Sequence, residues 1–292
     1  MPSVKFKNQL HLHFLVFIAG FTAILGELIS IDAIALVWFR MAIAAVMMFG
    51  YIKIKRVDLK IPFKTILKFF VAGIIIALHW ITFFAAIKAS NISITLAMFS
   101  TGAFFAAFIE PLFFRRKIIS YEIFFGLVVI FGVVLITQTE LRYLTGILLG
   151  ISSALFSTLF AVLNGKFVEQ HSATVISFYE FIGGVAFISL YLLFSDQGFS
   201  EDFFKLNSTD WICLFILASI CTAYAFIASI HVMKHITPFS VVLTYNLEPI
   251  YGIVLALVLF PETETMTPMF YVGALLIICT VLLNAVYKKT RN

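Results

Sequence analysis

The sequence is poor in charged residues. Only 12% of its 292 residues are Asp, Glu, Lys or Arg, whereas 62% are hydrophobic, and the mean hydropathy is +1.07. Soluble proteins carry roughly 25% charged residues, and the single core of a chain this size could not bury so much apolar surface. The excess predicts an integral membrane protein, for which lipid is the apolar solvent.

Motifs of soluble enzymes and nucleic-acid-binding proteins are also missing. The three cysteines, Cys213, Cys221 and Cys279, lie in apolar stretches, which predicts free thiols and neither a disulfide framework nor a zinc site. The sequence has no Gly-rich phosphate loop followed by Lys, no paired-His metal motif and no Ser nucleophile elbow. It also has no RNA- or DNA-binding motif. We therefore expect no ATP-driven pump, no enzyme, no metal, no cofactor and no nucleic-acid partner.

Ten apolar stretches fill most of the chain. Each is close to the roughly 20 helical residues that a hydrocarbon core of about 30 Å needs, and an isolated spanning segment must be helical to satisfy its backbone hydrogen bonds. The stretches run approximately over residues 11–29, 33–52, 66–87, 93–114, 121–138, 144–163, 174–194, 211–232, 238–259 and 268–287. The first lacks a small-residue cleavage site, so we interpret it as an uncleaved span. The sequence therefore predicts an all-α integral membrane protein with ten transmembrane helices.

The basic residues predict how these helices are oriented. Lys88, Arg142 and Lys205 fall on one side of the predicted membrane, and Arg40 lies inside the second span. All other Lys and Arg residues fall on the opposite side, in the N-terminal segment, the loops and the C-terminal tail. Because basic loops stay in the cytoplasm, both termini are expected to be cytoplasmic, which requires an even number of spans.

The two halves of the chain resemble each other. An offset of 147 residues superimposes the third to fifth spans on the eighth to tenth without a gap, and a shifted register upstream pairs residues 38–40 with 178–180. Identical pairs in the first register are Ser93 with Ser240, Leu96 with Leu243, Phe113 with Phe260 and Gly126 with Gly273. We predict two five-helix repeats, residues 1–140 and 141–292. Because five is odd, the second repeat is inverted, as in transporters whose two halves alternate around one central site.

Four segments carry a family resemblance. They are Trp38-Phe39-Arg40 in the second span, the third-span ending over residues 79–97, the ninth-span run over residues 240–262, and Gly273. With ten spans in two repeats, the chain resembles the EamA family of the drug/metabolite transporter superfamily. The first repeat departs from the family pattern, because Gly102 and Arg115 stand where Pro and Glu are usual.

The resemblance implies a secondary transporter, or permease, that moves small metabolites out of the cell by alternating access. Amino acids or related amphiphilic compounds are the substrates that it implies, and a bacterial inner (plasma) membrane is the location. The partners are then a small-molecule metabolite and the lipid bilayer. A coupled proton stays open, since a chain without an energy-coupling domain uses facilitated diffusion or an ion gradient.

Other functions and oligomeric states also stay open. The chain could be a non-transporting membrane scaffold or receptor. It could be an intramembrane lipid-modifying enzyme, although the clustered interfacial acids or histidines that such an enzyme needs are not seen. Gly146 and Gly150 form a GxxxG motif that suits close helix packing within one chain or in a homodimer.

Ionisable side chains at membrane depth are the leading candidates for substrate contact, because burying each costs at least a few kcal/mol. Glu248 directly precedes Pro249, and the locally opened helix, with Tyr245 and Asn246, could bind a substrate amine or a proton. Arg40 could bind a substrate carboxylate bidentately. The structural alternatives are helix packing for the carboxylate, and an ion pair or a snorkelling side chain for the arginine.

Further polar and aromatic residues are candidates for lining a central cavity. His79 could relay a proton, and Trp80 could stack on a planar substrate; packing is the alternative for both. Tyr224 and Tyr179 each need a hydroxyl partner, which a polar cavity would supply. Thr101 aligns with the ninth-span carboxylate and could line the same cavity, unless its hydroxyl bonds back to its own helix.

Two other acidic residues are expected to act in gating or in structure. Glu180 aligns with Arg40 in the shifted register, so opposite charges occupy symmetry-related positions. Glu110 precedes Pro111 near the cytoplasmic end of the fourth span, with Arg115 in reach. This arrangement predicts an ion pair and a kink at the end of that helix.

Overall fold

The structure is a computed structural model that describes residues 4–115, 117, 119–195, 198–233, 244–245 and 247–291. Within these residues every regular element is helical, which confirms the all-α class for the described chain. The first half contains α1 (Val4–Leu28), α2 (Ala33–Lys55), α3 (Phe63–Ala89), α4 (Ile92–Phe99), α5 (Gly102–Phe114), α6 (Ser120–Thr139) and the short η1 (Leu141–Tyr143). The second half contains α7 (Leu144–Phe167), α8 (Ala173–Phe194), α9 (Glu201–Phe204), α10 (Ser208–Ala218), the π-helix η2 (Ser219–Tyr224), α11 (Ala225–Met233), α13 (Glu248–Leu259), α14 (Pro261–Glu264) and α15 (Pro268–Arg291).

Side-chain caps define where several helices begin. The Asp32 carboxylate accepts hydrogen bonds from the N–H groups of Ile34 and Ala35 at the start of α2. Asn91, Ser172 and Asn207 cap α4, α8 and α10 in the same way. Such caps satisfy N–H groups that a helix cannot satisfy internally, so the apolar runs become helices with sharp starts.

Eight helical segments of the described chain are long and apolar enough to cross a membrane, if α4 with α5 and α10 with η2 and the start of α11 each count as one span. The described chain is therefore a multi-pass membrane protein. Two further apolar helices are shorter, Glu248–Leu259 and Pro268–Asn284. They correspond to the ninth and tenth predicted spans, and residues 238–243 of the ninth lie outside the described residues. The outer faces of the spans expose large apolar side chains, such as Val46, Phe124 and Leu275, which suits contact with lipid.

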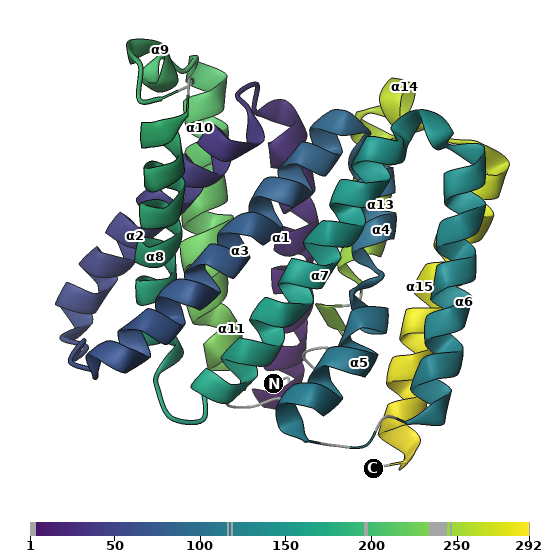
Figure 1. The fold of residues 1–292 in the computed structure, drawn as a ribbon, viewed down its shortest axis with the longest axis horizontal. Helices are drawn as coiled ribbons and strands as arrows, with labels where there is room; N and C mark the ends of the chain where they lie inside the picture. Colours follow the sequence, from purple (N-terminus) through teal and green to yellow (C-terminus); the bar gives the residue numbers. More distant parts are fainter. Residues whose placement is uncertain are drawn as a thin grey trace.

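Two ends of the bundle differ in which connections they carry (Figure 1). At the lower end α1 begins and α15 ends, and the connections α2–α3, α5–α6 and α7–α8 lie there too. The opposite, upper end carries α9, α14 and the connections between α1 and α2 and between α3 and α4. The chain thus crosses from end to end, and its first and last helices share the end that has the basic α2–α3 and α5–α6 connections.

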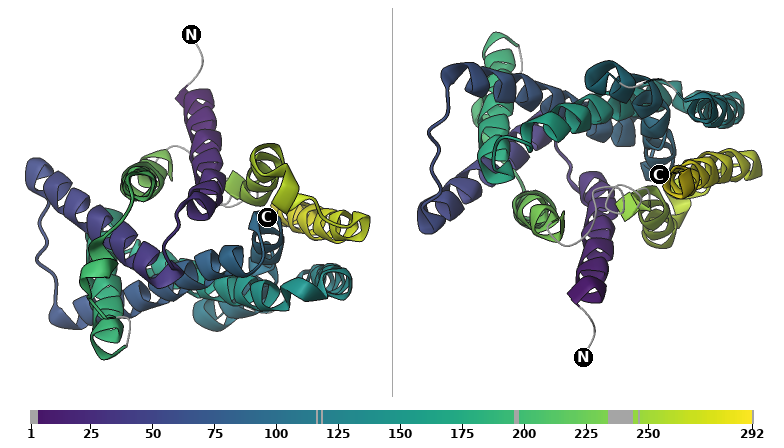
Figure 2. Two further views of the ribbon diagram at one scale, coloured as in Figure 1. Left: turned by 90° about the horizontal axis from the view of Figure 1, so that it is seen from above. Right: turned by 90° about the horizontal axis from the view of Figure 1, so that it is seen from below.

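Helix pairs follow a pattern of exchange between the two halves. The first helix of the first predicted repeat, α1, packs on α13, and the first helix of the second predicted repeat, α7, packs on α4 and α5. Likewise α3 packs on α8, while α10 and η2 pack on α2. Counterparts also pack on each other: α6 on α15, α2 on α8, and α4 on α13. Figure 2 shows α6 and α15 side by side at one edge of the molecule.

Buried carboxylates tie the connections of the upper end together. Glu264 of α14, 1% exposed, accepts hydrogen bonds from the backbone N–H groups of Ile92 (2.9 Å) and Ser93 (2.8 Å) at the start of α4. Asp210 of α10 accepts two hydrogen bonds from Ser30, between α1 and α2. Each tie joins the first half of the chain to the second at this end.

Candidate functional site

Arg40 is a buried cation in the middle of α2. Its side chain is only 3% exposed, and its Nε donates a hydrogen bond to the Thr222 hydroxyl at 2.9 Å. The guanidinium carbon lies 3.8 Å from the centroid of the Trp80 ring and 5.7 Å from that of Phe84, both on α3. Its Nη1 is buried and has no hydrogen-bond partner among the described residues. A buried, unsatisfied N–H donor of this kind is unfavourable unless a ligand or water completes it.

Thr222, in the π-helix η2, is the hydrogen-bond partner of Arg40. The Thr222 hydroxyl donates to the carbonyl of Leu217, five residues earlier, at 2.8 Å, while it accepts the hydrogen bond from Arg40. π-Helical turns inside α-helices are frequent at functional sites. The sequence reading missed Thr222, because a single Thr in an apolar span is common and its partner lies 182 residues away.

Glu248 lies at the first position of α13, next to the buried Pro249. It is half-buried, and its charge lies within the range of electrostatic attraction to Arg40. Gly20 of α1 brings this part of the chain close: a Cβ there would come within 3.1 Å of the Glu248 carbonyl oxygen and 3.0 Å of the Gly252 nitrogen. A residue with a side chain at Gly20 would therefore displace the segment that holds the carboxylate.

The fourth span is broken at the depth that aligns with Glu248. The helix α4 ends at Phe99 and α5 starts at Gly102, with Ser100 and Thr101 between them. The hydroxyls of Ser100 and Thr101 donate to the carbonyls of Leu96 (3.1 Å) and Met98 (2.6 Å). The Thr101 hydroxyl is therefore occupied within its own helix turn.

His79 and Trp80 face different neighbours, since consecutive helix residues point about 100° apart. The Nδ1 of His79 lies 2.9 Å from the hydroxyl of Ser153 on α7, and its ring stacks on Phe99 with centroids 5.4 Å apart. Trp80 instead lies under Arg40. His79 therefore helps to hold α3 against α7 and α4, and only Trp80 touches the arginine.

Glu180 is fully buried on α8 and has partners separate from those of Arg40. Its Oε1 accepts a hydrogen bond from the side-chain amide of Asn164 on α7 at 2.8 Å, and its Oε2 has no partner among the described residues. Gly73 of α3 presses against the Glu180 backbone, where a Cβ would clash with the carbonyl oxygen. The charges that align between the repeats thus bind to different side chains.

The remaining predicted residues are dispersed. The Tyr179 hydroxyl donates to the carbonyl of Leu59 at 2.9 Å in the α2–α3 connection, and the Tyr224 hydroxyl, at the end of η2, bonds to His11 at 2.8 Å. Tyr245 packs against the larger of two apolar cores. Glu110 lies half-buried in the last turns of α5. Asn246 is outside the described residues.

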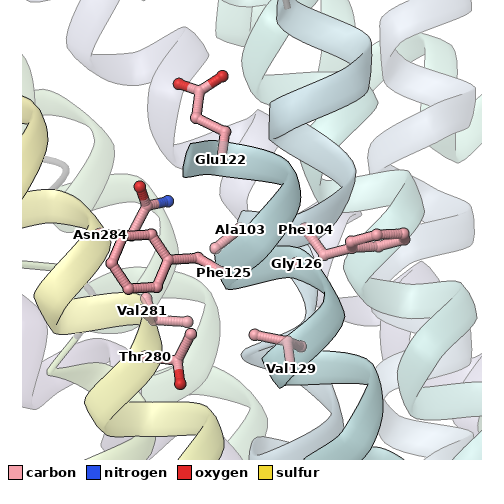
Figure 3. A pocket seen from close by; sticks show the side chains of 9 residues that line it. All are labelled: Ala103, Phe104, Glu122, Phe125, Gly126, Val129, Thr280, Val281 and Asn284. Carbon is pink, nitrogen blue, oxygen red and sulfur yellow. The ribbon is translucent and has the colours of Figure 1, made fainter. Parts of the chain in front are cut away.

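Two hollows lie elsewhere in the bundle. Figure 3 shows the first, between α5, α6 and α15, with Glu122 and Asn284 among its lining side chains. Its volume of about 10 Å³ has room for about one water molecule, so it is too small for a metabolite. The second, about 600 Å³, opens beside Tyr179 at the lower end.

Close packing within the chain surrounds the GxxxG glycines. A Cβ at Gly146 would meet Ser90, and one at Gly150 would lie 2.8 Å from Met98. This face of α7 is therefore used by α3 and α4. Among the side chains that the structure describes, no three of His, Cys, Asp or Glu gather as metal ligands.

Comparison with known proteins gives a family match and structural matches. The family model described as "EamA-like transporter family" matches residues 10–138 and 144–286. One solved crystal structure, described only as that of a protein, is 14% identical, covers 96% of this chain and 99% of its own, and has a TM-score of 0.64. At that identity the likeness concerns the fold alone. No curated protein matches the chain.

Proposed function

This chain belongs to the EamA-like transporter family, and on that premise we propose that it exports small zwitterionic metabolites, such as amino acids, by alternating access. Membership makes it a membrane transporter of the drug/metabolite type. The substrate class, the direction and the mechanism are the proposal. The proposed site lies between Arg40 and Glu248, beside Trp80 and Thr222.

Arg40 is the feature on which the substrate class depends. Its guanidinium is fixed by Thr222 and by the Trp80 ring, while Nη1 stays free of protein partners among the described residues. A carboxylate placed there would supply the missing acceptor and gain charge-assisted hydrogen bonds. The Glu248 carboxylate, which is attracted to Arg40, would also attract an ammonium group. A molecule with both charges would therefore satisfy both residues.

The arrangement of the helices supports two inverted five-helix repeats, residues 1–140 and 141–292, with ten spans. Each helix pair described above has a counterpart that is obtained by exchanging the halves, as inverted repeats require. The break between α4 and α5 and the start of α13 fall at aligned positions. Interrupted spans at corresponding positions are typical of transporter binding sites.

We assign the lower end of the bundle to the cytoplasm of a bacterial inner membrane. The basic α2–α3 and α5–α6 connections lie at that end together with the start of α1 and the end of α15, and basic loops stay cytoplasmic. Both termini are then cytoplasmic. A coupled proton is part of the proposal, because export against a gradient needs an energy source. The sequence has no Gly-rich phosphate loop followed by Lys with which to use ATP.

Transport by the full chain in liposomes tests the proposal. Labelled amino acids, nucleosides and sugars are compared with and without a pH gradient. We expect flux for amino acids. Arg40→Lys should lower it about 10- to 100-fold, because Lys keeps the charge but loses the planar fork that stacks on Trp80. Lys205→Gln, an exposed change on the upper end, is the control and should have no effect.

A deaminated analogue separates the two charges. Glu248→Gln should reduce transport of an amino acid while it spares the matching carboxylic acid that lacks the amine. A scaffold or receptor would tolerate both substitutions. No flux for any compound in a folded preparation would refute the transport proposal.

A further inference from the structure

A basic cleft lies at the lower end, apart from the Arg40 site. It has a volume of about 600 Å³ and is bounded by the end of α2, the α2–α3 connection and α8. That volume is within the range of about 300–1,000 Å³ typical of ligand pockets. Three cations, Lys53, Arg56 and Lys60, line it, together with one acid, Asp58. The Asp58 carboxylate accepts a hydrogen bond from the backbone N–H of Lys60 at 2.9 Å, so this acid is bonded within its own loop.

Hydrogen bonds to the backbone fix the residues that line the cleft. The Tyr179 hydroxyl donates to the Leu59 carbonyl at 2.9 Å and so ties the connection to α8. The N–H of Arg56 donates to the carbonyls of Ile52 and Lys53 at the end of α2. Arg56 itself has φ 52° and ψ 42°, a left-handed conformation that favours glycine. An arginine thus occupies a position where glycine would fit with less strain.

An apolar wall continues from the cleft along α2 towards the hydrocarbon. Phe49 lines the cleft, is 43% exposed, and stacks on Phe178 of α8 with ring centroids 6.0 Å apart. Val46, almost one turn further into the span, is 71% exposed. The Lys53 ammonium lies 5.2 Å from the Phe49 ring. Cations and a surface suited to acyl chains therefore adjoin each other.

We propose that this cleft binds the headgroup phosphate of an anionic phospholipid of the cytoplasmic leaflet. Arg56 supplies a fork for two phosphate oxygens, and Lys53 and Lys60 supply point charges. The acyl chains lie along Phe49 and Val46. Basic pockets beside membrane-spanning helices on the cytoplasmic side are suited to such headgroups. A free phosphate would use the same cations but not the apolar wall.

Lipid binding to the full chain, purified in an uncharged detergent, tests the site. Phosphatidylglycerol, phosphatidylcholine and inorganic phosphate are titrated separately, and bound molecules are counted by native mass spectrometry. The cleft variant K53Q/R56Q/K60Q should bind phosphatidylglycerol about 100-fold more weakly, since each cation near a lipid surface contributes about fivefold, or about 1 kcal/mol. Phosphatidylcholine should bind more weakly than phosphatidylglycerol to the unaltered protein.

The matched control is K55Q/K64Q/K68Q. It removes the same charge from exposed positions on α2 and α3 that do not line the cleft, and it should change the affinity for phosphatidylglycerol less than fivefold. Equal losses in both triple variants would refute a defined site. So would equal affinity for the two lipids, or inorganic phosphate that binds as tightly as phosphatidylglycerol.

Arg56→Gly keeps the proposal testable if the cleft variant does not fold. Glycine relieves the left-handed conformation, so the melting temperature should stay the same or rise, while phosphatidylglycerol binding should weaken about fivefold. Unchanged binding in a stable Arg56→Gly protein would overturn the proposal. Transport is not measured in these experiments, so their failure would leave the proposed function untouched.

Discussion

The Glu264 carboxylate is expected to hold the upper end of the bundle closed. Its Oε1 and Oε2 accept the N–H groups of Ile92 and Ser93 at 2.9 Å and 2.8 Å, and the side chain is 1% exposed. It therefore satisfies two N–H donors at the start of α4, and its negative charge interacts favourably with the positive end of the helix dipole. Because Glu264 lies in α14 and the donors are the first two residues of α4, these bonds join the two proposed repeats.

Glu264→Gln should weaken this closure by about 3 kcal/mol. One carboxylate oxygen becomes an NH₂ group that faces a backbone N–H, so one charge-assisted hydrogen bond is lost and one buried donor is left unpaired. The lost hydrogen bond is worth about 1.5–3 kcal/mol, and the unpaired donor costs about 1–3 kcal/mol. A loss of about 3 kcal/mol corresponds to a change of more than 100-fold in the opening equilibrium.

Labelling of a buried cysteine measures that opening. Thr95→Cys places a thiol at a fully buried position one turn into α4, in a chain whose native cysteines are replaced. A membrane-impermeant maleimide should then react about 100-fold faster when Glu264→Gln is added. Glu262→Gln, on the exposed side of α14, is the control and should not change the rate. Equal labelling of the two variants would refute the reasoning.

Three further predictions concern the core and the candidate site. Gly73→Ala should lower the thermal stability by about 2 kcal/mol, because the new methyl group clashes with the backbone of Glu180 and α3 must move away from α8. Thr222→Val should lower amino-acid transport about 10-fold without loss of folded protein, because Arg40 loses its hydroxyl acceptor. Thr101→Ala should leave transport nearly unchanged, because that hydroxyl bonds only within its own helix turn.

Matched variants check these three results. Gly50→Ala adds a methyl group where nothing lies within 4 Å, so thermal unfolding should show no loss. Thr82→Val removes a hydroxyl that bonds to carbonyls of its own helix, so liposome transport should stay unchanged. If Gly50→Ala and Gly73→Ala lower the melting temperature equally, close packing is not the cause. Transport lost equally in both threonine-to-valine variants would argue against a role for Thr222.

Hydropathy predicted the helical class and most helix positions. The predicted fifth span, 121–138, agrees with α6 (Ser120–Thr139) to within a residue at each end, because its polar flanks are sharp. The break in the fourth span was not predicted, although Gly102, where Pro is usual in the family, was noted there. The number of spans stays a prediction for the ninth and tenth, which the described residues represent by shorter apolar helices.

The site residues show that charged candidates can be found from one sequence, whereas their hydrogen-bond partners cannot. Arg40 and Glu248 stood out because charge is rare in the spans, and the structure places them in electrostatic reach of each other. Thr222, Ser153 and Asn164 did not stand out, since ordinary polar residues gain meaning only from partners in another helix. The candidate substrate residues stay predictions, and the structure places Tyr179 at the basic cleft of the lower end instead of beside Arg40.

Two buried carboxylates of the upper end, Asp210 and Glu264, bond to neutral groups. Asp210 and Glu264 use backbone N–H groups and hydroxyls as donors, and both are shielded from water. Dissolved ions weaken exposed charge pairs within a Debye length of about 8 Å but hardly affect bonds inside a dry interior. The two buried ties of this end should therefore depend little on salt concentration, whereas the interactions of the exposed lysines at the lower end should weaken as the ionic strength rises.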